Sequence, residues 1–279
     1  MRLSEVINNG ANILKKNNIP NFFLDSEILI SKILEKKREY IILNQNLEIK
    51  KNDYLKFISL IQKRSSHIPL AYLTKSKDFW KSEFFVDNRV LIPRPDTEII
   101  IEEVLSILKA KKINNFLEIG VGSGCIVLSI LNEIKLLKAT GIDISQKALE
   151  VCKINSKKLG LNSRLKLYKS DIDKFDIGKY DLIVSNPPYI DKVGLKNLDK
   201  NVTFEPINAL NGGVDGTSEI RKVINTASKL IKINGKLIIE IAYNQKFKVV
   251  NLLEKKGFYI NKVIKDYSNL DRCIVSTKK

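Results

Sequence analysis

The sequence predicts an α/β protein, with a seven-stranded Rossmann-like domain over residues 93–279 and a small helical bundle in front of it. Apolar residues recur at helical spacing through residues 1–75. From residue 113 onward, segments typical of strands alternate with segments typical of helices. This alternation indicates a mostly parallel sheet that is covered by helices on both faces.

Three amphipathic segments make up the N-terminal region. LSEVINNGANILKK begins at Leu3, and DYLKFISLIQKR begins at Asp53. Between them, DSEILISKILEKK follows Pro20, and Asp25 or Ser26 can serve as its N-cap. Because this region has no glycine-rich loop and no acid-base cluster, we expect a domain that docks a partner.

A β-hairpin linker is predicted over residues 76–92. DFWKSEFFVDNRVLI alternates along its length and is rich in aromatic and β-branched residues. Asp87-Asn88 supplies the residue types of a hairpin turn, so we expect the chain to reverse there.

The remaining elements follow in strand and helix order. A helix is predicted over residues 97–110, with Asp96 or Thr97 as its cap and acidic residues in its first turn. The predicted strands cover residues 113–119, 138–144, 164–170, 180–185, 236–241, 258–266 and 271–278. The predicted helices between them cover residues 124–134, 145–160, 218–231 and 244–257. The last two strands are joined by a short loop and should pair antiparallel.

The net charge of +17 raises the question of nucleic-acid binding. Lys, Asn and Ile are abundant throughout the chain, including its scaffold helices, so the charge does not require direct contact with nucleic acid. No apolar run reaches the roughly 20 residues of a membrane span, and the N-terminus lacks the apolar block of a signal peptide. We therefore expect a cytoplasmic protein with no membrane contact, and we take a monomer as the simplest state.

Metal binding is not expected. Cys125, Cys152 and Cys273 lie far apart in the sequence, and His67 is the only histidine. Because zinc sites are built mainly from cysteine and histidine, such a site would be hard to assemble here.

A glycine-rich turn is the first sign of a ligand site. In FLEIGVGSGC, Gly120, Gly122 and Gly124 allow a tight turn and a close approach of the backbone to a ligand. The acid Glu118 precedes the first glycine, and it would repel phosphate but attract an amino group. S-adenosylmethionine carries an amino group and a sulfonium without phosphate, so we expect it as the methyl donor, with S-adenosylhomocysteine as product.

Two further loops at strand ends fit an adenosine. Asp143 ends the next predicted strand, where a carboxylate can accept hydrogen bonds from both ribose hydroxyls, and Ser145 is the better helix cap. The third strand leads to Asp171 and Ile172. Asp171 could accept from the adenine amino group and Ile172 could pack on the ring, and the sequence leaves this choice open.

The fourth strand ends in Asn186-Pro187-Pro188-Tyr189. The prolines stiffen the loop, so a planar NH₂ group could donate to the Asn186 side-chain oxygen and the Pro187 carbonyl while Tyr189 stacks on it. Holding both N–H groups aims the nitrogen lone pair at a methyl donor, so catalysis would come from positioning and electrostatics. We therefore predict Asn186, Pro187 and Tyr189 as catalytic, and all four residues as substrate-binding.

Taken together, these motifs resemble the PrmC (HemK) family of release factor glutamine methyltransferases over nearly the whole chain. The resemblance rests on NPPY together with HIPLAYLTKSKDFW (67–80), LIPRPDTE (91–98), LEIGVGSG (117–124), FEPINALNGGVDG (204–216) and Asp271-Arg272. Lys75 and Ala242 stand where the family commonly has glycine, and Glu118 replaces a more usual aspartate.

The resemblance implies a class I methyltransferase domain, a substrate-recognising helical domain, and methyl transfer to the glutamine of the Gly-Gly-Gln loop of class I peptide chain release factors. It also implies contacts between the cofactor and Gly120, Val121, Gly122, Ser123, Gly124, Asp143, Ile172 and Asn186. We expect LIPRPDTE and FEPINALNGGVDG to flank the pocket.

Two alternatives share the same chemistry. A sister enzyme that modifies a glutamine of a large-subunit ribosomal protein also has NPPY, but RPDTE resembles the release-factor branch. A DNA adenine-N6 methyltransferase would also hold a planar NH₂ group, yet it needs a base-reading region that the first 75 residues do not provide. A non-catalytic module is a third alternative, against which the intact NPPY and Asp143 both speak.

Overall fold

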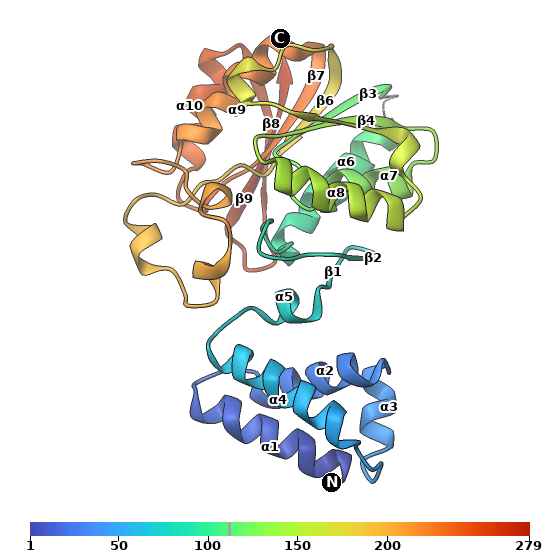
Figure 1. The fold of residues 1–279 in the computed structure, drawn as a ribbon. Coiled ribbons are helices and arrows are strands. Elements are labelled where there is room, and N and C mark those ends of the chain that lie inside the picture. The colour runs from blue at the N-terminus through green and yellow to red at the C-terminus, as the bar shows by residue number, and fades with distance from the viewer. Residues whose placement is uncertain (111–112) are drawn as a thin grey trace. The chain divides into compact units, whose positions relative to one another are not determined.

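The computed structural model describes residues 1–110 and 113–279, which divide into two compact units (Figure 1). One unit comprises residues 1–76 together with 199–204. The other comprises residues 77–198 together with 205–279.

The first unit is a bundle of helices. Its helices are α1 (Leu3–Lys16), α2 (Phe22–Leu34), α3 (Arg38–Leu43), α4 (Lys51–Ser65) and α5 (Leu70–Thr74). The apolar faces of α1, α2 and α4 meet in one core, which contains Leu14, Leu29 and Phe57. The three amphipathic segments predicted from the sequence are thus confirmed as helices, because burial of these faces supplies most of the stability of short helices.

The expected N-cap of the second helix is wrong. α2 begins one turn earlier, so Asp25 and Ser26 lie within the helix and are buried. Asp25 Oδ2 accepts a hydrogen bond of 2.7 Å from Arg64 Nε, and Ser26 donates to a carbonyl of α1. Arg64 also donates to Asn201 Oδ1 at 3.0 Å, which ties residues 199–204 into this unit.

The hairpin forms, but its turn is not where the sequence predicted it. Its strands are β1 (Lys77–Phe79) and β2 (Ser82–Phe84), which pair antiparallel. The chain reverses at Trp80, which adopts a φ of 55°. At Asp87 the predicted turn residues do form a local turn, but the Asp87 carboxylate accepts from the Arg89 backbone and side chain, and no paired strand follows. The hydrogen bonds of the Asp87 side chain therefore take the place of backbone pairing between two strands at this turn.

The second unit is built on a seven-stranded sheet in the order β5-β4-β3-β6-β7-β9-β8. Its strands are β3 (Asn115–Ile119), β4 (Lys138–Asp143), β5 (Leu165–Lys169), β6 (Tyr180–Ser185), β7 (Ile231–Glu240), β8 (Phe258–Lys265) and β9 (Asp271–Lys278). The neighbours from β5 to β7 pair parallel, whereas β9 pairs antiparallel with both β7 and β8. Both the predicted parallel sheet and the antiparallel pairing of the last two strands are confirmed.

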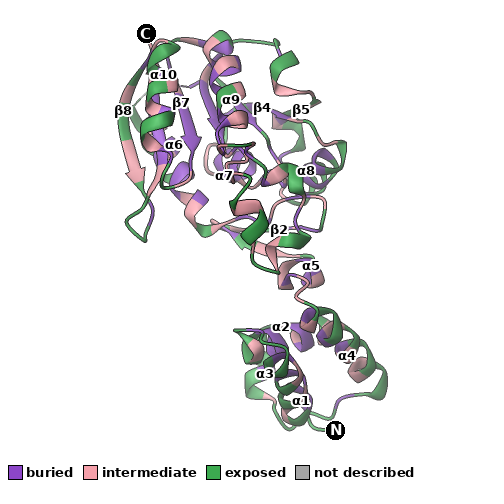
Figure 2. Cartoon of the chain, turned by 90° about the vertical axis from the view of Figure 1, so that its left-hand side faces the viewer, coloured by how far each residue is buried: buried purple, intermediate pink, exposed green. Residues whose placement is uncertain are grey.

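Helices cover both faces of this sheet (Figures 1 and 2). They are α6 (Glu98–Ala110), α7 (Cys125–Glu133), α8 (Gln146–Lys158), α9 (Ser218–Leu230) and α10 (Lys246–Lys255). Short 3₁₀ helices are η1 (Pro95–Thr97), η2 (Asn162–Arg164), η3 (Ile172–Lys174), η4 (Gly194–Asn197) and η6 (Ile207–Ala209), with η5 (Val202–Phe204) in the first unit's inserted segment. The inner strands β3 and β6 are mostly buried between these helices, whereas the edge strand β8 is mostly exposed or half-buried (Figure 2).

Alternation along the strands sets the two cores apart. Phe116, Leu182 and Ile238 pack with α6, α7 and α8. The next residue along each of these strands packs with α9 and α10. Successive residues of a strand point to opposite faces, so nearly continuous apolar strands are expected in a sheet that is buried on both sides.

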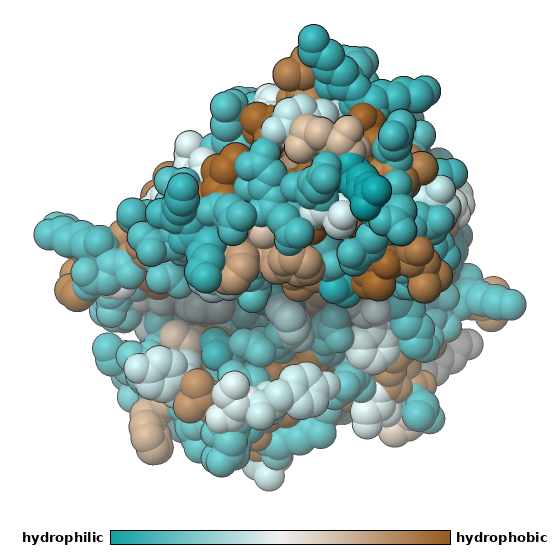
Figure 3. All heavy atoms as spheres, turned by 90° about the horizontal axis from the view of Figure 1, so that it is seen from below, coloured by the Kyte–Doolittle hydropathy of each residue, from teal (hydrophilic) through white to brown (hydrophobic). Residues whose placement is uncertain are grey.

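Apolar side chains at the surface are scattered. In Figure 3 they appear as small brown groups separated by hydrophilic atoms. Within residues 1–110 and 113–279, no helix has the length and apolar character required to span a membrane. Among the same residues, no group of three or more His, Cys, Asp or Glu side chains is arranged to hold a metal ion.

Candidate active site

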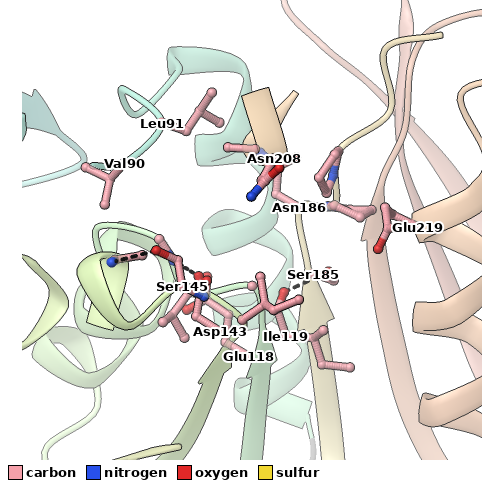
Figure 4. A pocket seen from close by; sticks show the side chains of 18 of the residues that line it. Val90, Leu91, Glu118, Ile119, Asp143, Ser145, Ser185, Asn186, Asn208 and Glu219 are labelled. Carbon is pink, nitrogen blue, oxygen red and sulfur yellow. Dashed lines mark hydrogen bonds between the residues drawn. The ribbon is translucent and has the colours of Figure 1, made fainter. Parts of the chain in front are cut away.

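A cavity of about 420 Å³ lies at the carboxyl ends of the parallel strands of the second unit (Figure 4). The loops after β3, β4, β5 and β6 all contribute to its wall. Strand β3 lies inside the sheet, and the chain leaves it toward β4 on one side and reaches β6 on the other. Open α/β sheets bind ligands at such a switch point.

The glycine-rich turn forms the floor of the cavity between β3 and α7. Gly120, Gly122 and Gly124 have positive φ values of 77°, 52° and 81°, which explains why glycine is needed in this turn. The Gly122 N–H donates to Asp143 Oδ2 at 2.9 Å, and the Ser145 N–H donates to Asp143 Oδ1 at 2.9 Å. Asp143 therefore joins the first two loops, and Ser145 caps α8 as the sequence predicted.

Glu118 is a buried carboxylate at the end of β3. Its exposed fraction is 1%, and Oε2 accepts from the Val127 N–H in the first turn of α7 at 2.8 Å. Burial raises its pKa well above the ordinary value, and the neighbouring Asp143 raises it further. Burial also raises the pKa of Asp143, partly offset by its backbone hydrogen bonds. Within the described part of the chain neither carboxylate pairs with a basic side chain, so this wall favours a cationic ligand.

Asp171 and Ile172 lie on the third loop, and both line the cavity. The Asp171 carboxylate accepts from the Asp173 N–H at 3.3 Å and begins η3. The Ile172 carbonyl accepts from the Thr226 hydroxyl at 3.0 Å, which fixes this loop against α9. Both residues therefore remain candidates for the adenine contact.

The fourth loop carries the NPPY tetrapeptide. Asn186, Pro187 and Pro188 line the cavity, and Figure 4 shows Asn186 across it from Glu118 and Asp143. The Asn186 amide nitrogen donates to Thr97 Oγ1 at 3.2 Å, so this bond leaves the side-chain oxygen available as an acceptor.

Two of the predicted site residues do not line the cavity. Gly124 is the N-cap residue of α7, and the Tyr189 hydroxyl donates to Glu240 Oε1 at 3.2 Å. Burial raises the Tyr189 pKa, and the charge of Glu240 raises it further. The contact of Tyr189 with substrate thus stays a prediction.

The two flanking segments that the sequence singled out do line the cavity. Leu91, Pro93 and Arg94 come from LIPRPDTE, and Pro206 and Asn208 come from FEPINALNGGVDG. An ion pair between Arg94 and Glu205 joins the two segments, and Glu205 also accepts from the Ile92 N–H at 3.0 Å.

Sequence reasoning missed two residues next to NPPY. Thr97 was expected as a helix cap and as part of the flanking segment LIPRPDTE, but its hydrogen bond to Asn186 was not predicted. Glu240 was treated only as part of an apolar strand, although it is an acid at the carboxyl end of a parallel strand. The same signal identified Asp143, so it was available for Glu240 as well.

Comparison with known proteins identifies the family. Residues 5–74 match the PrmC N-terminal domain, and residues 102–266 match the Methyltransferase small domain. The release factor glutamine methyltransferase of Clostridium acetobutylicum is 34% identical, over 100% of this chain and 99% of its own length. That of Buchnera aphidicola subsp. Schizaphis graminum is 36% identical over 96% of each chain. The chain belongs to the release factor glutamine methyltransferase family.

Membership of the release factor glutamine methyltransferase family confirms the resemblance seen in the motifs. The chain is a methyltransferase that uses S-adenosylmethionine as methyl donor. The cavity fits that cofactor, because it combines a glycine turn open to a ligand, a carboxylate pair that favours a cation, and no basic cradle for phosphates in the glycine turn.

Proposed function

We propose that this protein transfers a methyl group to the side-chain amide nitrogen of the Gly-Gly-Gln glutamine in class I peptide chain release factors. One observation supports this proposal most directly. The Asn186-Pro187 acceptors border the same cavity as the buried carboxylate Glu118 and the half-buried carboxylate Asp143. The names of its relatives supply the substrate class. Because release factors act in translation, we infer that the methylation takes place in the cytoplasm.

The proposed cofactor site uses the first three loops. The Glu118 carboxylate attracts the amino group, Asp143 accepts from the ribose hydroxyls, and Asp171 or Ile172 meets the adenine. Gly120, Val121, Gly122 and Ser123 surround the ligand with backbone, while Gly124 fixes the start of α7. When bound, the cofactor supplies an electrophilic methyl group.

The proposed chemistry of NPPY is to hold a poor nucleophile. An amide nitrogen has a delocalised lone pair, so the loop must orient it. The Asn186 side-chain oxygen and the Pro187 carbonyl accept the two N–H bonds, which raises electron density on the nitrogen and aims its lone pair into the cavity. The proton leaves after methyl transfer, so no strong base is required.

We assign recognition of the protein substrate to residues 1–75, with 76–92 as the linker and 93–279 as the catalytic domain. The match of residues 5–74 to the PrmC N-terminal domain supports this division. So does the absence of any described cavity-lining residue from that part of the chain.

The test is methylation of a purified release factor, read by mass spectrometry of the Gly-Gly-Gln peptide. We expect one added methyl on the glutamine, and a loss of about 10²- to 10³-fold in kcat for Asn186→Ala, as for removal of a preorganised catalytic hydrogen bond. Asn251→Ala, an exposed asparagine on α10, is the matched control and should behave as the unchanged protein.

Other outcomes would revise the proposal in defined ways. A methyl group on a ribosomal protein or on adenine in DNA, but not on the release factor, would overturn the substrate and keep the methyl-transfer mechanism. Equal rates for Asn186→Ala and the unchanged protein would overturn the role of NPPY. Transfer to none of the three substrates would overturn the proposed activity.

A further inference from the structure

A buried acid behind the NPPY loop has no part in the proposed reaction. Glu240 is the last residue of β7, its exposed fraction is 1%, and it does not line the cavity. Strand β7 pairs parallel with β6, with Ile239 opposite Ser185, so Glu240 stands beside the start of the NPPY loop. A carboxylate in this position needs a reason, because burial of an acid is costly without compensating partners.

The contacts of Glu240 reach both ends of the tetrapeptide. At one end, the Tyr189 hydroxyl donates to Glu240 Oε1 at 3.2 Å. At the other end, the Asn186 amide nitrogen donates to Thr97 Oγ1 at 3.2 Å, and the Thr97 hydroxyl in turn favours the charged form of Glu240. One carboxylate is therefore linked to Tyr189 directly and to Asn186 through a single intervening residue.

Among residues 1–110 and 113–279, no basic side chain forms a direct ion pair with Glu240. Arg272 of β9 favours the charged form at a distance, but its guanidinium is bound to Asp266 at 2.9 Å and lies 3.9 Å from Asp96. Asp96 opposes the charge, and no protein group in the described residues hydrogen bonds to Glu240 Oε2. The hydrogen bond that Oε1 accepts thus comes from Tyr189, a residue of NPPY.

Other titratable groups also face this carboxylate. The thiols of Cys125 at the start of α7 and of Cys273 on β9 both feel its charge, and burial raises the pKa of each thiol. Both thiols therefore stay neutral near neutral pH. Burial raises the Glu240 pKa to about 7, with Thr97, Arg272 and Tyr189 opposing that rise.

We propose that Glu240 is a positioning residue for the methyl acceptor: its carboxylate orients Thr97 and Tyr189, and through Thr97 it fixes the Asn186 amide that holds the substrate nitrogen. This inference rests on the proposed role of Asn186. It assigns to Glu240 no contact with substrate or cofactor. A mis-set Asn186 amide would present its NH₂ group where an acceptor is needed, so orientation matters for the reaction.

The role carries a pH signature. Above pH 7 the charged carboxylate accepts from the Tyr189 hydroxyl, and the Thr97 hydroxyl favours this charged form. As the pH falls through about 7, protonation of Glu240 weakens these interactions and loosens the Asn186 orientation. The rate should therefore fall on the acid side with an apparent pKa near 7. A glutamine at position 240 keeps the shape of the side chain but does not titrate, so it should remove this acid limb.

The experiment compares the unchanged protein with Glu240→Gln and Glu240→Ala on the release factor, from pH 5.5 to 8.5. We expect Glu240→Ala to lower kcat about 10- to 100-fold, as for loss of a residue that orients a ligand-binding group. Glu240→Gln should give a flat profile between pH 6 and 8, at about the rate that the unchanged protein shows at the acid end of this range, because its amide is neutral like the protonated carboxyl. Binding of S-adenosylmethionine, measured by calorimetry, should stay within about two-fold in both variants, because Glu240 lies outside the cavity.

Contrary results separate this inference from the proposed function. If the unchanged protein methylates the glutamine and both variants keep its kcat and its pH profile, the positioning role is overturned. The same holds if cofactor binding falls in step with the rate, since that result means general damage to the fold. If the unchanged protein modifies no glutamine, the proposed function itself fails and the inference fails with it.

Discussion

The buried acids of the helical unit and those of the cavity have opposite surroundings. In the helical unit, Asp25 meets Arg64 at 2.7 Å and Glu27 meets Arg38 at 2.7 Å. Around the cavity, burial raises the pKa of Glu118, Asp143 and Glu240. In the described residues none of these three forms an ion pair within 4 Å.

This difference separates structural charges from functional ones. A buried carboxylate with a bound cation has its desolvation compensated within the protein. A buried carboxylate without one is destabilising unless a ligand or a hydrogen-bond network uses its charge. The comparison therefore predicts that changing the first kind lowers stability, whereas neutralising the second kind raises stability and lowers function.

The largest expected effect is in the helical unit. Arg64→Met would leave Asp25 buried without a cation and would also remove the bond to Asn201. We expect a loss of about 3–5 kcal/mol in the free energy of opening of this unit. Hydrogen–deuterium exchange of the α1, α2 and α4 amides measures it, because those helices share one core.

The control for this change is Lys56→Met, which removes an equal charge from an exposed side chain that lies 3.9 Å from Asp53. It should alter exchange by less than about 0.5 kcal/mol. Equal exchange rates in the Arg64 and Lys56 variants would show that the ion pair of Asp25 does not stabilise the helical unit. This result would contradict the claim that the paired buried acids are structural charges.

Most elements could be predicted from the sequence because their signals are local. The strand YDLIVS was placed at its observed bounds, Tyr180–Ser185, and the segment LSEVINNGANILKK at those of α1. Their periodicity is strong and their ends carry turn residues. The hairpin turn was misplaced because Asp87 and Asn88 fit a turn locally, whereas the pairing of Phe79 with Ser82 is decided by packing.

The site could be predicted only where one loop carried its own signal. NPPY and the glycine turn are each continuous in sequence. Asp25 looked like a cap because a helix start and a buried ion pair use the same residue type, and its partner Arg64 lies 39 residues away. The link from Asn186 through Thr97 to Glu240 joins three distant segments, so no single window of the sequence contains it.

The second prediction concerns Glu118. Because burial raises its pKa in the folded state, its contribution to stability is present at low pH and is lost as the pH rises through the folded-state value. Glu118→Gln keeps the acceptor for the Val127 N–H without the charge. We expect a gain on the order of 1 kcal/mol at pH 8, which is about 2–4 °C in melting temperature, and little gain near pH 5.

The same variant should bind S-adenosylmethionine about 10-fold more weakly, since the charge that attracts the amino group is gone. Calorimetry at pH 8 measures the affinity, and thermal unfolding of the ligand-free protein measures the stability. A variant that loses stability and keeps its affinity would place Glu118 among the structural charges.

The smallest effect is expected where an acid is paired but exposed. Lys158 on α8 forms an ion pair with Glu83 on β2, and both side chains are roughly half exposed. Water screens such a pair and the ordering of two long side chains offsets its attraction, so its net value is small. In a double-mutant cycle of Lys158→Met and Glu83→Gln, we expect a coupling of less than about 0.5 kcal/mol in thermal unfolding, falling further at high salt. A coupling as large as the effect of Arg64→Met would mean that pairing alone, and not burial with pairing, distinguishes the structural acids from those around the cavity.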